Sequence, residues 1–226
     1  MKNVKATLSL IARAFCAGAM LLPASSSLAA PIAPTSYDMP NGDGQASGGT
    51  YNYWDRNYTG AGSTTTDGAA LSGGLGKLTD GVVSTSLWYN VSNAQGTGEY
   101  VGWYRPVTLN PVITFHFAGN PSIDSITIQL DNSNVGGVIA PSAIRVDGIS
   151  ESFTPPALGT VGSVTLGGLS LVGPTHTIEL DQVPGYWVFV SEISFDGTAT
   201  QAPEPASLAL LGLALTAIPL ARRRRN

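Results

Sequence analysis

The 226-residue chain contains 11 basic and 15 acidic residues, 27 glycines and a single cysteine. This length accommodates one domain of ordinary size beside terminal signals. One cysteine excludes a disulfide framework, and the acidic balance argues against nucleic-acid binding, which needs a basic footprint.

The N-terminal 30 residues have the pattern of a secretory signal peptide. A basic start at 2–13 precedes an apolar stretch at 14–22, and small residues follow. We expect signal peptidase to cut after Ala29 or Ala30. Cys16 lies in the removed segment, so the mature chain is predicted to carry no thiol.

The part between the two terminal signals is strongly acidic. Residues 31–202 hold four basic and fourteen acidic residues, a net charge of −10. This charge fits an extracellular protein and leaves carboxylates free for a hard cation such as calcium.

Residues 31–75 are predicted to form a leader and a loop-rich entry to the domain. The segment 31–50 is rich in Pro, Gly, Ser and Asn, and 59–76 in Gly, Ser, Thr and Ala. Both compositions are typical of loops.

Between these loops, the stretch YNYWDRNY at 51–58 combines four aromatic rings with hydrogen-bonding side chains. Sugars stack an apolar face on an aromatic ring, while polar side chains bond their hydroxyls. GEYVGWYR at 98–105 has both ingredients too. We therefore predict contacts to an extracellular polysaccharide from Trp54, Asp55, Arg56, Tyr58 and Tyr104.

From 76 to 200 the sequence consists of short β-type runs separated by Gly, Pro and Asn turns. In VITFHF (112–117), alternation places Ile113, Phe115 and Phe117 on one face unless a bulge intervenes. In SIDSITIQL (122–130), Asp124, Ile126, Ile128 and Leu130 share one face, and Ile123 lies on the other with Ser125, Thr127 and Gln129. Many short strands without a long helical period predict an all-β, antiparallel β-sandwich or jelly roll. Further runs lie at 142–146, 163–172, 176–180 and 187–195.

Four stretches, in order, resemble discoidin-type domains, the coagulation-factor type C group. They are LTDGVVSTSLW (78–88), VGWYRPVTLNPVITFHF (101–117), GGVIAPSAIRV (136–146) and FVSEISFDG (189–197). The resemblance covers roughly residues 75–197 and implies a galactose-binding-like jelly roll. It also implies burial of the core-motif residues Trp88, Trp103 and Trp187.

The same resemblance implies a structural calcium site near the joined chain ends. Asp80 matches the aspartate of the family's Asp-Gly turn, and Glu192 matches the glutamate of its closing strand. The family's threonine is Thr85 when counted from the aspartate and Ser86 when counted back from the tryptophan. Val82 departs from the family, which often has Asp or Asn there, so carbonyls and water must complete the six to eight oxygens that calcium takes. The alternative is that the aspartate only forms a hairpin turn and Glu192 is a solvated strand residue.

The C-terminal 25 residues resemble the PEP-CTERM sorting signal of Gram-negative bacteria. Pro-Glu-Pro precedes an apolar run at 206–220 and an arginine cluster. As a helix this run spans roughly 22 Å, short for a hydrocarbon core of about 30 Å, although a plain membrane anchor is the alternative. The resemblance implies transient insertion in the inner membrane, cleavage by an exosortase, and delivery to the cell surface or medium. The residues that carry it are Pro203, Glu204, Pro205, Arg222, Arg223, Arg224 and Arg225.

Catalytic motifs are missing from the sequence. His116 and His176 lack the spacing of a metal pair, and there is no nucleophile elbow or phosphate loop. A glycosidase needs only two carboxylates, but the spacing singles out no pair. We therefore predict a non-catalytic, exosortase-sorted protein that binds extracellular polysaccharide. The alternative is a structural or adhesive matrix protein with no defined carbohydrate ligand.

Overall fold

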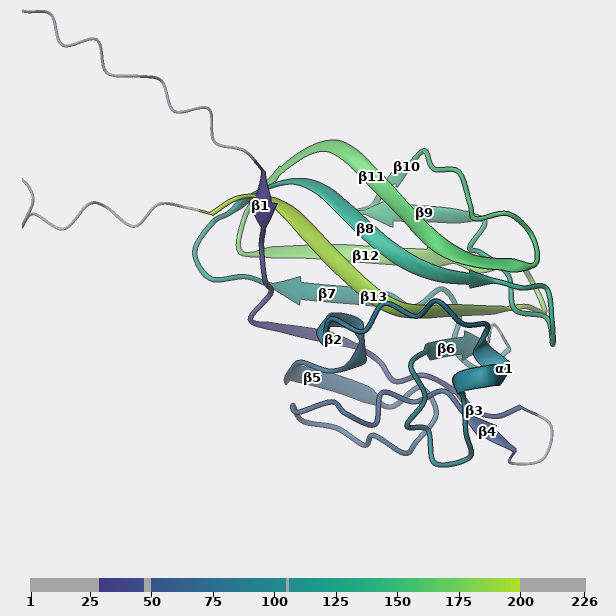
Figure 1. Ribbon diagram of the computed structural model, residues 1–226. Helices are drawn as coiled ribbons and strands as arrows, with labels where there is room; N and C mark the ends of the chain where they lie inside the picture. The colour runs from purple at the N-terminus through teal and green to yellow at the C-terminus, as the bar shows by residue number, and fades with distance from the viewer. Residues whose placement is uncertain (1–28, 47–49, 105, 200–226) are drawn as a thin grey trace, which may run out of the picture.

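Two antiparallel sheets packed face to face form most of the described chain, residues 29–46, 50–104 and 106–199 of this computed structural model (Figure 1). The first sheet has the order β1-β13-β8-β11, and β6 also pairs with β13. Its strands are β1 (Ala30–Pro31), β6 (Val101–Tyr104), β8 (Ser122–Asn132), β11 (Thr160–Val172) and β13 (Trp187–Thr198).

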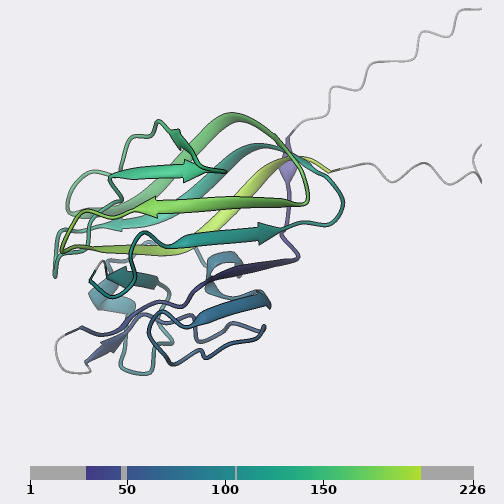
Figure 2. The same ribbon diagram turned by 180° about the vertical axis from the view of Figure 1, so that it is seen from behind.

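The second sheet has the order β10-β9-β12-β7-β2-β5 and lies toward the viewer in Figure 2. A small hairpin of β3 and β4, a short 3₁₀ helix and a one-turn α-helix lie in the connections. The strands of the second sheet are β2 (Ser36–Pro40), β5 (Ala70–Gly74), β7 (Val112–His116), β9 (Ala143–Val146), β10 (Ile149–Glu151) and β12 (Thr175–Asp181). The remaining elements are β3 (Gly44–Ala46), β4 (Tyr51–Asn52), η1 (Lys77–Thr79) and α1 (Trp88–Val91).

The predicted all-β sandwich is confirmed, and each strand expected after residue 110 is present. In β7 the expected face is buried, because Ile113 and Phe115 are fully buried and Phe117 follows at 6 % exposure. In β8 the face of Ile126, Ile128 and Leu130 is fully buried as expected.

Strand β8 departs from strict alternation at its start. Ile123 is fully buried although its sequence parity puts it on the opposite face from Ile126. Ser125 pairs with Asp196 and Ile123 with Gly197, so β8 carries one extra residue, Asp124, in a bulge. A bulge of one residue reverses the facing of the side chains beyond it, which returns Ile123 to the core.

The predicted boundary at residue 76 places the start of the sandwich too late. Strand β2 lies inside the second sheet, between β7 and β5, and buries Tyr37 and Met39. Strand β5, from the expected loop at 59–76, buries Leu71 at the sheet edge. The sequence hid these strands because their few apolar residues stand among glycine, proline and serine.

The space between the two sheets is filled by one apolar core. A buried Val, Leu or Ile side chain contributes roughly 1.5–3 kcal/mol, so this layer dominates the stability of the fold. Its central side chains come from both sheets: Ile113, Phe115, Ile126, Ile128, Leu130, Ile144, Ile178, Leu180 and Phe195.

A second, smaller aromatic cluster lies at the far end of the sandwich from the chain ends. The described ends lie side by side, because Ala30 pairs with Gly197 (Figure 1). Strand β13 starts at Trp187, and at about 3.3 Å per residue its other end lies roughly 35 Å away. The buried members of this cluster are Tyr53, Trp88, Tyr100, Val138, Trp187 and Phe189.

The signal peptide predicted at 1–30 lies almost entirely outside the described residues, as does the apolar run at 206–220. Within 29–46, 50–104 and 106–199, no helix is long and apolar enough to cross a membrane.

Candidate functional site

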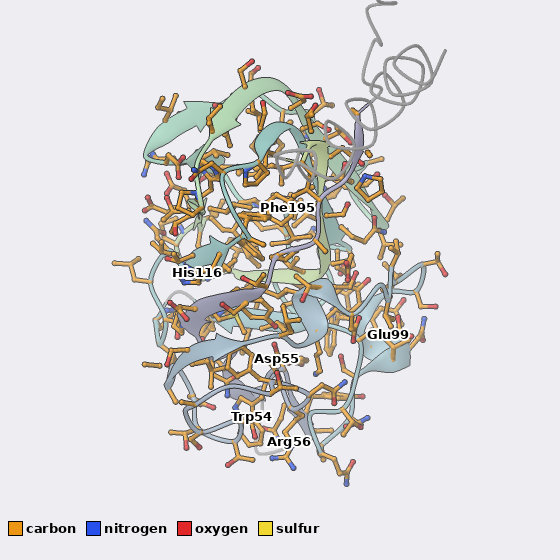
Figure 3. All side chains as sticks on the ribbon, turned by 90° about the vertical axis from the view of Figure 1, so that its left-hand side faces the viewer. Trp54, Asp55, Arg56, Glu99, His116 and Phe195 are labelled. Carbon is orange, nitrogen blue, oxygen red and sulfur yellow. The ribbon has the colours of Figure 1, made fainter. Side chains whose placement is uncertain are left out.

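The stretch 51–58, predicted to contact sugar, is divided between surface and interior. Asp55 is fully buried and Tyr58 is 7 % exposed, so neither is available to a ligand and both predictions are corrected. Figure 3 shows Asp55 further inside the molecule than Trp54 and Arg56. Trp54 is half-buried and Arg56 is exposed.

Asp55 is held by two donors to its carboxylate and by one acceptor for its backbone N–H. The Tyr37 hydroxyl donates to Asp55 Oδ2, and the Lys77 backbone N–H donates to Oδ1 at 3.1 Å. The Asp55 N–H donates to Asn41 Oδ1 at 2.9 Å. Burial raises the pKa of the Asp55 carboxyl, while the hydrogen bond from Tyr37 and the Lys77 charge oppose that rise. We call the buried residues Tyr37, Asp55, Tyr58 and Lys77 the Asp55 network.

The other two members complete this network. The Tyr58 hydroxyl donates to the Tyr37 carbonyl and accepts the Gly74 N–H at 2.9 Å. Lys77 Nζ donates to the carbonyls of Trp54 and Gly96, each at 2.6 Å. Burial lowers the pKa of Lys77 to about 8. Each polar group found its partner within the protein, so the Asp55 network is a structural support.

An aromatic cavity of about 600 Å³ lies at the end of the sandwich that carries the small aromatic cluster. Strand β6, the start of β13, α1 and the β3–β4 hairpin contribute to it. Its rings are Tyr51, Tyr53, Trp88, Tyr104, Trp187 and Phe189, and its other lining residues are Gly44, Thr50, Asp67, Val107, Gly136, Val138 and Gly185.

Strand pairing positions the rings of the cavity. Trp187 on β13 pairs directly with Tyr104 on β6, and paired residues present their side chains on the same face. Their rings stack with centroids 4.8 Å apart at 19°. Tyr53 meets Trp187 edge-on at 5.1 Å, and Tyr51 meets Trp88 edge-on at 5.4 Å. The rings therefore form a packed wall before any ligand binds.

Trp88 is held in this wall by backbone partners. Its backbone N–H donates to Asp131 Oδ2 at 2.7 Å, and its indole N–H donates to the Val135 carbonyl at 3.0 Å. Gly136 adopts φ +63°, and a Cβ there would lie 2.9 Å from Trp88 Cζ2. The close approach of this loop to the indole therefore requires glycine.

Two carboxylates lie at the cavity, one in its lining and one behind it. Asp67 Oδ1 accepts the Gly44 N–H at 2.6 Å and the Trp54 indole N–H at 2.7 Å. Asp43 is fully buried, accepts the Tyr104 N–H at 2.7 Å and the Thr108 hydroxyl at 2.8 Å, and so fixes the backbone of Tyr104. Burial raises the pKa of Asp43 to about 6, and the charge of Asp67 adds to that rise.

Tyr104 is thus the one predicted contact that lines the cavity. Trp54 does not line the cavity, but its indole N–H donates to the lining residue Asp67. Arg56 is not among the lining residues. Trp88 and Trp187 are 9 % and 8 % exposed, as expected for core tryptophans, yet both also line the cavity. The sequence reasoning missed Tyr51, Tyr53 and Asp67, because only the pairing of distant segments brings them together.

The predicted calcium residues are brought together in part. The Gly81 N–H donates to Glu192 Oε2 at 3.1 Å across 111 positions of sequence, and Asp80 Oδ1 caps its own turn through the Val82 N–H at 2.9 Å. Glu192 is 9 % exposed, so it is not a solvated strand residue. Burial and the nearby charge of Asp80 raise the pKa of Glu192 to about 7. Thr85 is exposed.

The described residues contain no group of three or more His, Cys, Asp and Glu side chains placed to hold a metal ion. The two histidines form separate pairs. His116 Nε2 lies 2.8 Å from Asp38, and His176 Nδ1 lies 2.7 Å from Asp147. His116 on β7 is half-exposed, whereas His176 on the neighbouring strand β12 is buried.

The fold and the cavity define an antiparallel β-sandwich module with a preformed aromatic site at its loop end. Residues 34–148, just over half of the chain, match the family model described as Discoidin domain-containing receptor 1/2, DS-like domain. The chain belongs to this discoidin-like family. The expected discoidin-type resemblance is confirmed, and the match begins earlier than residue 75, as β2 does.

Residues 201–225 match the PEP-CTERM protein-sorting motif, as expected from the sequence. This motif marks the protein as exported to the cell surface or beyond. These residues lie outside the described part of the chain.

Two solved structures are similar in part. CpGH89CBM32-5 from Clostridium perfringens, in complex with GalNAc-beta-1,3-galactose, is 17% identical with a TM-score of 0.29, over 44% of this chain and 77% of that one. A fucolectin from Morone saxatilis (striped bass) serum is 12% identical with a TM-score of 0.35, over 76% and 80%. No curated protein matches the chain.

Proposed function

We propose that this exported protein binds an extracellular polysaccharide through the aromatic cavity and performs no catalysis there. The observation that supports this function most is the preformed cavity of about 600 Å³, within the roughly 300–1,000 Å³ typical of small-molecule sites. Sites of this kind combine apolar walls with a few placed polar groups, as the six rings and Asp67 do here.

The stacked pair of Tyr104 and Trp187 supplies a flat apolar surface for the face of a sugar ring. Asp67 supplies a carboxylate acceptor for hydroxyl groups beside it. Tyr104 and Trp187 lie on the paired strands β6 and β13, and Asp67 lies in the loop before β5, which this β-scaffold supports. A single cavity of this size holds few sugar units, so strong attachment would come from many copies on one polymer.

Delivery to that polymer would follow from the two ends of the chain. Signal peptidase would remove the N-terminal segment, and an exosortase in the inner membrane of a Gram-negative bacterium would cut near Pro203–Pro205. Strand β1 begins at Ala30, next to the expected cleavage position, so cleavage after Ala29 would preserve its pairing with β13. Intact-mass measurement of protein from the cell surface or medium tests this: a mature species that keeps Arg222–Arg225 would exclude cleavage and support a plain anchor.

A structural calcium ion at Asp80 and Glu192 belongs to the same proposal. Asp80 and Glu192 are close enough for their carboxylates to repel each other, and a divalent cation between them would relieve this repulsion. No third acidic side chain among the described residues joins them, so backbone carbonyls and water would supply the remaining oxygens. Bound there, the ion would supply only stability, by joining the η1 turn to the closing strand β13.

The experiment for the binding function is a polysaccharide pull-down with wild type, Tyr104→Ala and a control, Ile149→Ala. Ile149 is 65 % exposed on β10, away from the cavity, so its change leaves the site intact. We expect Tyr104→Ala alone to weaken binding, with an unchanged fold by circular dichroism. Absence of polysaccharide binding in wild type would contradict the proposal and favour the structural or adhesive alternative.

A further inference from the structure

We propose that the cavity selects sugars carrying a free ammonium group, that is, hexosamine units that are not N-acetylated, over neutral and acidic sugars. This inference rests on the proposed polysaccharide-binding function and names its ligand class. The feature behind it is the juxtaposition of six aromatic rings with a carboxylate that has one oxygen left for a ligand.

The aromatic rings of the cavity can attract a cation. The face of an aromatic ring attracts a cation, most strongly for tryptophan, and a cavity with several ring walls is a common way to bind organic ammonium groups. Trp88 and Trp187 are both in the lining, together with Tyr51 and Tyr104. A neutral sugar needs one ring to stack on, whereas a lining that contains several rings also offers π-electrons to a cation.

Asp67 adds a carboxylate oxygen that can accept a hydrogen bond from an ammonium group. Its two hydrogen bonds, from the Gly44 N–H and the Trp54 indole N–H, both end on Oδ1 at 2.6 and 2.7 Å. Within the described residues, Oδ2 receives no hydrogen bond. These two donors fix the carboxylate in the lining and leave Oδ2 for an ammonium N–H, a charge-assisted hydrogen bond of the stronger kind.

The charges around the cavity also favour a cationic ligand. Asp43 lies buried behind Tyr104 and is close enough to feel the charge of Asp67. The lining residues of the described chain include no Lys, Arg or His to balance these carboxylates. The section 31–202 has a net charge of −10, so the field of the whole domain draws in cations and repels uronate or sulfated sugars.

The test measures affinity of the folded protein by titration calorimetry at neutral pH for three probes. These are a glucosamine oligosaccharide, its N-acetylated counterpart and an oligoglucuronate of similar length. We expect the glucosamine oligomer to bind roughly tenfold more tightly than the acetylated one, and the oligoglucuronate to bind weakest. We also expect tetramethylammonium ions to compete with the glucosamine oligomer.

The matched variants are Asp67→Asn and Asp196→Asn. Asparagine at 67 can keep its oxygen toward Gly44 and Trp54, so it replaces only the free acceptor by an amide donor. Asp196 lies on the same strand as Trp187, roughly 30 Å away, and controls for net charge. We expect Asp67→Asn to lose the preference for the ammonium form at unchanged melting temperature, and Asp196→Asn to keep it.

Each remaining outcome overturns a defined statement. Equal affinity for the free and the acetylated oligomer would overturn ammonium selection and leave the proposed polysaccharide binding intact. Tighter binding of oligoglucuronate would overturn the charge argument. Binding of no sugar would overturn both proposals. If Asp67→Asn fails to fold, failure of tetramethylammonium to compete in wild type decides against the ring argument without any variant.

Discussion

The Asp55 network and the aromatic cavity are made from the same residue types, and both use the stretch 51–58, yet they have opposite properties. In the Asp55 network, the carboxylate is fully buried and its donors are Tyr37 and Lys77. In the cavity, Asp67 is half-buried and both of its protein donors meet one oxygen. The two regions differ in whether both carboxylate oxygens have a hydrogen-bond donor within the protein.

That difference separates stabilisation from binding. A carboxylate whose partners are all internal stabilises the fold and has nothing left to offer a ligand. A carboxylate fixed through one oxygen is held in place and still accepts a hydrogen bond from outside. Ring packing shows the same contrast, because Tyr58 is enclosed against Tyr37 whereas Tyr104 stacks on Trp187 in the wall of a cavity.

The largest expected effect comes from Asp55→Ala, which breaks the first region. The change leaves the Tyr37 hydroxyl and the Lys77 backbone N–H without their acceptor and removes a negative charge near the buried Lys77 ammonium. Removing one member of a buried charged network costs about 3–5 kcal/mol. Urea denaturation measures the loss, with Asp196→Ala as control. A loss below about 1 kcal/mol would show that the Asp55 network is not a support.

Calcium removal is expected to have the next largest effect, again on stability and not on binding. Asp55 and Lys77 both feel the charge of Asp80, so the proposed ion lies beside the Asp55 network. At a hundredfold excess over Kd, an ion bound only to the folded state stabilises it by about 2.7 kcal/mol. A chelator should lower the melting temperature of wild type but not of Asp80→Ala. Identical melting temperatures of wild type with calcium and with chelator would contradict the proposed calcium site.

Tyr104→Ala is expected to affect the second region selectively. Loss of a stacked ring from the cavity wall should weaken sugar binding about tenfold, or about 1.4 kcal/mol, while stability changes by only about 1 kcal/mol. Parallel calorimetry and urea denaturation compare the two. If stability falls by several kcal/mol and binding of the folded fraction persists, Tyr104 belongs to the support and the distinction between the regions fails.

A further expected effect is a pH dependence of stability from Asp43. Its pKa is about 6 in the folded protein against 3.8 as the ordinary value, so between these limits the folded state holds a proton that the unfolded state has released. Stability should therefore fall as pH rises from about 4 to 6, by this group's contribution. Denaturation midpoints across this range should show a flatter slope in Asp43→Asn. An equal slope in both proteins would mean that Asp43 does not titrate as its burial indicates.

The strands after residue 110 could be predicted because their apolar residues alternate over five or more positions, as Ile113 and Phe115 do. The bulge at Asp124 could not be predicted, because it depends on how the residues of β8 pair with those of β13. Strands β2 and β5 were missed because Tyr37, Met39 and Leu71 stand among glycine, proline and serine, and only their neighbours in the sheet make them strands.

By itself, the sequence determined the all-β class, the C-terminal sorting motif and the discoidin-like family, because these depend on local periodicity and on contiguous motifs. Only the tertiary structure decided which carboxylates and rings are available. Asp55 stands among aromatic and polar residues and Asp67 among glycine, serine and threonine, and neither stretch shows which of the two side chains is buried. Whether such a side chain finds all its partners inside the protein is a property of segments far apart in the chain, such as Tyr37 with Asp55 and Tyr104 with Trp187, and no local pattern records it.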